Sequence, residues 1–205
     1  MTTFEMSPEK WAEKYIYNKK ERISRNMKYG SMLAEGLEND EANGDPLLDL
    51  MAAKLPKYDL ADKVIESDSG VEITNPHDGK KYVVPFLQDG KEKIPLVAKP
   101  DTASHDYMKF AEYKTSVKPW SQSMADQSGQ IGFYATTIWL KTGKIPLEIE
   151  LVNIETAYNP DGSLTVTGKM FRFPTKRTMA DIIKMTKRMR NAWHGIEKLC
   201  EKELL

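Results

Sequence analysis

The amino-acid sequence predicts a single domain of the α/β (α+β) class, built on a central mixed β-sheet that is flanked by helices. Apolar residues recur at helical spacing near both ends of the chain, and at every second position through much of its middle. The 205 residues suffice to bury one sizeable core, and no low-complexity or Pro/Gly/Ser-rich linker divides them. We therefore expect helices before, within and after one sheet.

Helices are expected throughout the N-terminal region, residues 7–55. Ser7, Pro8 and Glu9 are typical of a helix start, with serine as the cap, proline at the first position and an acid in the first turn. The predicted helices span residues 7–20, 23–38 and 46–55.

The central region, residues 63–143, begins with hairpins and ends with a helix. Asp-Gly pairs at 78–79 and 89–90 separate β-prone segments and predict tight turns. The expected strands are residues 71–74, 81–87, 94–98 and 108–114. Helical spacing returns over residues 120–140, and Gly143 is placed to end that helix.

The C-terminal region, residues 147–204, is predicted to form a hairpin followed by a helix. The segment Asn159-Pro160-Asp161-Gly162 consists of residues that favour turns, so it should join strands at 147–158 and 163–173. An amphipathic helix from residue 179 to about residue 204 closes the chain.

Charge is unevenly distributed along a chain whose formal net charge is zero. Segments 14–28 and 169–190 are mainly basic, and an acidic segment, 35–49, lies between them. This pattern fits phosphate-binding edges around a metal centre, and it equally fits solvated helix faces. The single cysteine, Cys200, excludes a disulfide within the chain and a cluster held by several cysteines. Without an apolar signal region or a membrane-length apolar run, a soluble, cytoplasmic protein is expected.

Two neighbouring strand segments carry the residues with the strongest chemical signal. Asp101 ends an apolar strand, and eleven residues later Glu112 and Lys114 are two positions apart on another strand, so they share a face while Tyr113 points away. If the two strands pair, Asp101 and Glu112 supply two oxygen ligands for a hard cation such as Mg²⁺. Lys114 could then polarise an attacking water or offset charge on a phosphate.

An ion pair on a half-exposed sheet face is the structural alternative for Glu112 and Lys114, and such pairs contribute little to stability. The same bare pattern of an acid, any residue and a lysine occurs at 78–80 and 89–91, where tight turns explain it.

The motifs together resemble the RecB-like and phage-exonuclease branch of the PD-(D/E)XK nuclease superfamily. In chain order they are Pro100-Asp101, Glu112-Tyr113-Lys114-Thr115-Ser116, and a helix with Gln130 and Tyr134 one turn apart. The resemblance extends more weakly over residues 30–172. It implies a restriction-endonuclease-like core and metal-dependent hydrolysis of DNA in recombination, repair or phage DNA processing.

The resemblance also implies a site and its partners. One or two Mg²⁺ or Mn²⁺ ions would be bound by Asp101, Glu112 and the main-chain carbonyl of Tyr113, with Lys114 as the catalytic lysine and Gln130 and Tyr134 lining the site. The implied partner is duplex or single-stranded DNA, with a recombination partner protein or a second copy of the chain as further associations.

The sequence departs from this family upstream of the motifs. Relatives often carry a helix in which Gly and three further residues precede a metal-binding His, whereas here Gly30 is followed at that distance by Ala34. Glu38, one turn beyond Ala34, or the adjacent Glu35 could supply a carboxylate instead. Glu38 is favoured because it lies nearer the apolar face, and the alternative for both residues is a solvated helix charge.

Two other functions are compatible with the sequence. One is a nucleic-acid-binding protein that has the nuclease fold without cleavage activity, which would have no need for the combination of Asp101, Glu112 and Lys114. The other is an unrelated protein-interaction domain in which the Glu-x-Lys pattern is accidental. Metal-dependent cleavage of linear DNA separates all three.

Overall fold

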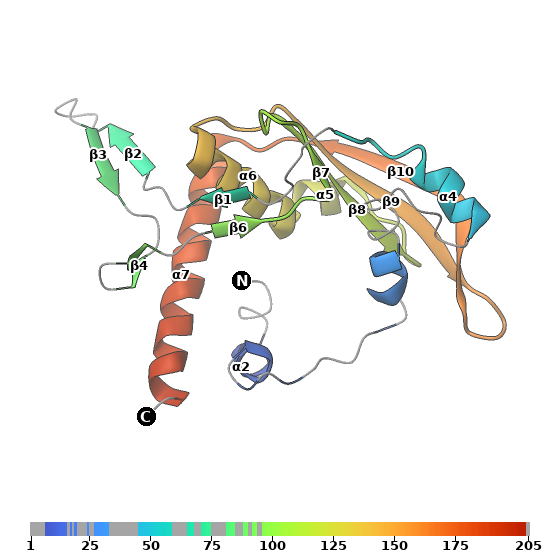
Figure 1. The fold of residues 1–205 in the computed structure, drawn as a ribbon, viewed down its shortest axis with the longest axis horizontal. Coiled ribbons are helices and arrows are strands. Elements are labelled where there is room, and N and C mark those ends of the chain that lie inside the picture. The colour runs from blue at the N-terminus through green and yellow to red at the C-terminus, as the bar shows by residue number, and fades with distance from the viewer. Residues whose placement is uncertain are drawn as a thin grey trace.

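The computed structural model describes residues 7–15, 17, 19, 24, 27–32, 45–58, 65–67, 71–74, 81–84, 88–89, 92–93 and 96–203. They form a mixed α/β fold with a four-stranded mixed sheet flanked by helices, as the sequence predicts (Figure 1). No described helix is both long and apolar enough to cross a membrane.

The four-stranded sheet has the order β10-β9-β8-β7. Its strands are β7 (Thr102–Ala103), β8 (Lys109–Ser116), β9 (Glu148–Tyr158) and β10 (Leu164–Thr175). Strands β8 and β9 are parallel, and the other two pairs are antiparallel. A parallel pair needs a crossover connection, and here helices α5 (Gln122–Asp126) and α6 (Gly129–Thr142) provide it.

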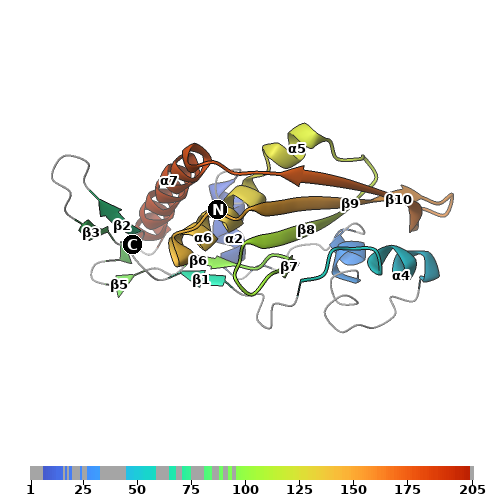
Figure 2. The ribbon, with the colours of Figure 1, turned by 90° about the horizontal axis from the view of Figure 1, so that it is seen from above.

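Each face of this sheet is covered by a helix. On one face, α6 packs its buried side chains against Phe110, Ile149 and Leu151. On the other, α4 (Pro46–Ala52) packs Leu48 and Met51 against strands β8, β9 and β10. The long helix α7 (Met179–Glu203) lies beside α6 (Figure 2), and its Ile182 belongs to the same buried cluster as Ile149 and Leu151.

The remaining elements lie around this core. They form three antiparallel pairs: β1 (Ile65–Ser67) with β6 (Leu96–Ala98), β2 (Val71–Thr74) with β3 (Lys81–Val84), and β4 (Gln88–Asp89) with β5 (Glu92–Lys93). Of these strands, β2, β3 and β6 are predicted from the sequence, and β1, β4 and β5 are not. The β2–β3 hairpin projects away from the four-stranded sheet, beyond α7 (Figure 1). The first predicted hairpin is confirmed, because β2 pairs with β3 in antiparallel fashion. Around the second predicted turn β4 pairs with β5, whereas the expected strand at 94–98 pairs with β1 instead of with the strand at 81–87. Residues 78–79 and 90 lie outside the described residues.

Local capping signals place several ends of the elements. The Ser7 hydroxyl accepts a hydrogen bond from the Lys10 amide at 3.2 Å, which confirms the predicted start of α2 (Pro8–Tyr15). Gly143 has φ 72° and its amide donates to the Trp139 carbonyl at 2.8 Å, which confirms the predicted end of α6. Gly162 has φ 76° in the turn between β9 and β10, where the sequence predicts a turn.

Three predicted boundaries are wrong. Helix α2 ends at Tyr15, well before residue 20. The predicted helix 120–140 is two helices, because the Ser128 hydroxyl accepts a hydrogen bond from the Ile131 amide at 3.4 Å and caps a new helix after α5 has ended. Helix α4 ends at Ala52 rather than at residue 55. Of the predicted helix 23–38, residues 27–32 are helical, and residues 23, 25–26 and 33–38 lie outside the described residues.

Candidate active site

Asp101 lies directly before β7, where its carboxylate contacts the backbone of β8. Its Oδ2 accepts a hydrogen bond from the Tyr113 amide at 2.6 Å. The β7–β8 ladder ends at the pair of Thr102 and Ala111, and Pro100 has no amide hydrogen with which to extend it. The Asp101 carboxylate therefore continues the hydrogen bonding of β8 in place of a strand.

The strand pairing that was expected to bring Asp101 beside Glu112 is wrong, although the two residues do lie close together. From the sequence, Asp101 was expected to meet Glu112 if the strand at 94–98 paired with the strand that carries Glu112. Instead, Leu96–Ala98 pairs with Ile65–Ser67, and the two-residue strand after Asp101 pairs with β8. The pairing of β6 with β1 ends just before Asp101, and the pairing of β7 with β8 begins just after it. Asp101 therefore lies beside Glu112.

Glu112 and Lys114 share one face of β8, as the period of a strand requires. Lys114 Nζ lies 2.6 Å from Glu112 Oε1. Tyr113 points to the opposite face, where its hydroxyl donates to the Pro56 carbonyl. The Glu112 side chain is only 4% exposed and that of Lys114 is 28% exposed. This pair is therefore largely buried. The structural alternative for the Glu-x-Lys pattern, an ion pair on a half-exposed sheet face, does not describe it.

Gln130 and Tyr134 extend this pair into a chain of hydrogen bonds. Lys114 Nζ donates to Gln130 Oε1 at 2.7 Å, and Gln130 Nε2 donates to the Tyr134 hydroxyl at 2.7 Å. The Tyr134 ring packs edge-on against Phe110, with centroids 6.1 Å apart. Burial, and after it the charge of Glu112, raises the pKa of Tyr134, so its hydroxyl stays neutral.

The electrostatics of Glu112 are those of a buried carboxylate next to another acid. Burial is the largest cause that raises its pKa to about 7, the Asp101 charge adds to it, and Lys114 opposes both. Glu112 Oε2 is buried and has no hydrogen-bond partner within the part of the chain that the structure describes. Native proteins seldom leave a buried acceptor unsatisfied, because it loses its hydration without replacement.

A bound divalent cation would satisfy this oxygen. Oxygen donors from Asp101 and Glu112 suit a hard cation such as Mg²⁺ or Mn²⁺. No group of three His, Cys, Asp or Glu side chains clusters among the described residues. A further protein ligand would have to be a main-chain carbonyl such as that of Tyr113, or a carboxylate from elsewhere in the chain.

Glu35 and Glu38, the expected substitutes for a missing histidine, lie outside the described residues. The helical segment 27–32 just before them is described. A Cβ added at Gly30 would lie 3.7 Å from Thr115 Oγ1, so this segment passes beside β8 one residue after Lys114.

Two buried polar residues that contact elements carrying site residues were not predicted from the sequence. Asn153, fully buried on β9, contacts the end of β8 and the loop before α5. Arg177 is 8% exposed, and its guanidinium donates to the carbonyls of Ala125 and Ser128 at 3.1 and 3.2 Å. Burial lowers the pKa of Arg177. Asn153 interrupts the apolar run 151–154, and asparagine is unfavourable in a strand. This interruption is the sequence feature that could have indicated a special role for Asn153.

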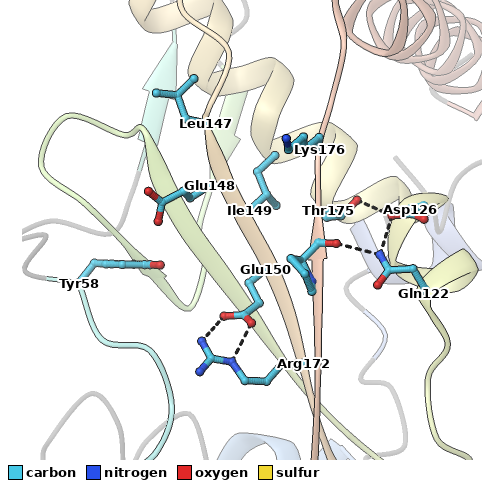
Figure 3. A pocket seen from close by; sticks show the side chains of 11 residues that line it. Tyr58, Gln122, Asp126, Leu147, Glu148, Ile149, Glu150, Arg172, Thr175 and Lys176 are labelled. Carbon is cyan, nitrogen blue, oxygen red and sulfur yellow. Dashed lines mark hydrogen bonds and ion pairs between the residues drawn. The ribbon is translucent and has the colours of Figure 1, made fainter.

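A hollow of about 660 Å³ lies apart from this site (Figure 3). Its polar side chains bind one another: Arg172 donates to Glu150 at 2.7 and 2.5 Å, and Gln122 and Thr175 donate to Asp126 at 2.9 and 2.7 Å. Asp101, Glu112 and Lys114 do not line it.

No protein-family model, curated protein or solved structure matches this chain. The geometry of the site therefore carries the functional argument.

Proposed function

We propose that the protein is a divalent-metal-dependent nuclease that hydrolyses DNA phosphodiester bonds, of the RecB-like type within the PD-(D/E)XK superfamily. The observation that carries the proposal is the buried Glu112 carboxylate, which lies beside Asp101: one oxygen is paired with Lys114 at 2.6 Å, and the other has no hydrogen-bond partner of ordinary geometry among the described residues. Two acids and a lysine held together in this way cost stability, which favours a chemical role for them.

The order of elements supports the same proposal. Asp101 precedes β7, the Glu-x-Lys pair lies on the antiparallel neighbour β8, the Gln130 helix follows, and β9 returns parallel to β8. The order of the Asp101, Glu-x-Lys and Gln130 motifs is the one that the resemblance describes.

In the proposed mechanism, Asp101 and Glu112 would hold the cation, which when bound would supply an activated water and a Lewis acid for the phosphate. Lys114 offsets the negative charge that develops on the scissile phosphate. Gln130 accepts a hydrogen bond from Lys114 and so limits the directions in which the ammonium group can point. Displacement is in line, with no covalent enzyme intermediate.

In this proposal, exposed cations on and between β10 and α7 contact the phosphate backbone and make binding sensitive to salt. They are Lys169 on β10, Lys176 in the loop that follows it, and Lys184, Lys187 and Arg190 on α7.

A binding protein without cleavage activity is the second function considered, and the buried site argues against it. Binding a phosphate backbone needs exposed cations, and a buried Glu112 adds only a repulsive charge to such an interface. An accidental Glu-x-Lys pattern in an interaction domain predicts an exposed pair, whereas Glu112 is 4% exposed.

Cleavage of linear DNA should require Mg²⁺ or Mn²⁺ and stop with excess chelator, because no described side chain is arranged to activate water alone. The measurement is loss of full-length labelled DNA with each metal and with chelator. Cleavage that persists in excess chelator contradicts the mechanism.

Cleavage should also be directed to DNA ends, since the Gln130–Tyr134 helix belongs to the exonuclease-like branch in the resemblance. Linear DNA should be shortened to small products while a covalently closed circle of the same sequence survives. Discrete internal fragments from the circle would instead indicate an endonuclease.

A further inference from the structure

We propose that Asn153 is a positioning residue for Lys114, an inference that rests on the proposed nuclease function. Asn153 has no contact with Glu112 or Asp101 among the interactions of the described residues, so it acts through the backbone around Lys114.

The amide of Asn153 joins two segments where β8 leaves the sheet. Nδ2 donates to the Lys114 carbonyl at 3.1 Å and to Ser116 Oγ at 2.9 Å. Oδ1 accepts from the Trp120 amide at 3.2 Å. The Asn153 side chain thus holds both the end of β8 and the loop that leads to α5.

Both segments determine where the Lys114 ammonium group lies. Its chain begins on β8, and its Nζ is held by Glu112 on the same strand and by Gln130 on α6. The loop at Trp120 connects that strand to the two helices of the crossover. A shift of either segment therefore changes the Lys114–Gln130 contact, and displacements of about 1 Å in a catalytic group can lower rates about 100-fold.

The sheet itself does not require an asparagine at this position. Strands β8 and β9 pair through their backbones over eight residue pairs, from Lys109–Glu148 to Ser116–Glu155. The preceding inward residue on β9, Leu151, is apolar and fully buried. A leucine at 153 would keep the branched shape, although it is larger, without the cost of burying an amide. The asparagine is thus explained by the groups that it joins.

The experiment compares Asn153→Leu and Asn153→Asp with a matched control, Thr156→Val, which also removes a buried polar group from β9. Asn153→Leu removes all the bonds of the amide. Asn153→Asp keeps an acceptor for the Trp120 amide and loses the donor to the Lys114 carbonyl, so it provides a second reading if the leucine variant does not fold.

For both Asn153 variants we expect kcat for linear duplex DNA to fall about tenfold or more, while KM and Mn²⁺ affinity by calorimetry change less than about twofold. Only in Asn153→Leu should the Trp120 amide exchange faster with solvent. In both, the Lys114 side-chain NMR signals should shift. Thr156→Val should leave all of these unchanged.

An unchanged kcat in a folded Asn153 variant overturns the proposal. So does a parallel loss of kcat, metal affinity and stability that Thr156→Val shares, because that pattern shows a general structural role. If the wild-type protein does not cleave DNA, the proposed function fails, and the NMR signals of Lys114 still decide whether Asn153 positions that side chain.

Discussion

Lys114→Met should lower the rate of metal-dependent DNA cleavage by about 10²- to 10³-fold, the range found when one group that stabilises transition-state charge is removed. Lys114 Nζ is 2.6 Å from Glu112 and 2.7 Å from Gln130, so methionine removes the only described cation bonded to this carboxylate. Methionine preserves most of the aliphatic stem, and Glu112 can accept a proton in place of the lost charge. Circular dichroism should therefore show a folded protein, and single-turnover cleavage should show the loss.

The matched control is Lys109→Met. Lys109 lies on the same strand and pairs with Glu148 at 2.8 Å, but their side chains are 45% and 60% exposed. Exposed pairs contribute little, so cleavage should stay within about twofold of wild type. Equal losses in the two variants, or native activity in Lys114→Met, would remove Lys114 from the mechanism.

The features predicted correctly from the sequence depend on local chemistry. Ser7, Gly143 and Asn159-Pro160-Asp161-Gly162 each act on backbone groups within a few residues, so a cap or a turn can be recognised without knowing the fold. The same holds for Glu112 and Lys114, which the period of a strand places on one face.

The features that were missed depend on partners far away in the chain. Strand β7 has two residues and β1 has three, too few to show a period, so the pairing of β8 could not be assigned correctly. Asn153 binds the Lys114 carbonyl across 39 residues, and Arg177 binds the Ala125 carbonyl across 52. Ser128 in a helical pattern resembles an exposed helix position until its capping bond to Ile131 is seen.

The metal-free protein should become less stable as the pH rises from about 5 to about 8. Burial and Asp101 raise the pKa of Glu112 from 4.5 to about 7. Between these values the folded protein holds a proton that the unfolded chain has released, so the free energy of unfolding falls with rising pH and levels off above pH 7. At about 1.4 kcal/mol for each pH unit between the two pKa values, the loss is roughly 3 kcal/mol.

Urea unfolding in chelator measures this loss, and Glu112→Gln isolates it. Glutamine does not titrate near neutral pH, so subtracting the variant's pH profile from that of wild type cancels the contributions of other groups. Saturating Mg²⁺ should abolish the difference in slope, because a cation bound by Asp101 and Glu112 favours the charged carboxylate and stabilises the folded state. If the wild-type profile in chelator were parallel to that of Glu112→Gln, Glu112 would be ionised over the whole pH range. Burial and the charge of Asp101 would then not raise its pKa, contrary to the geometry.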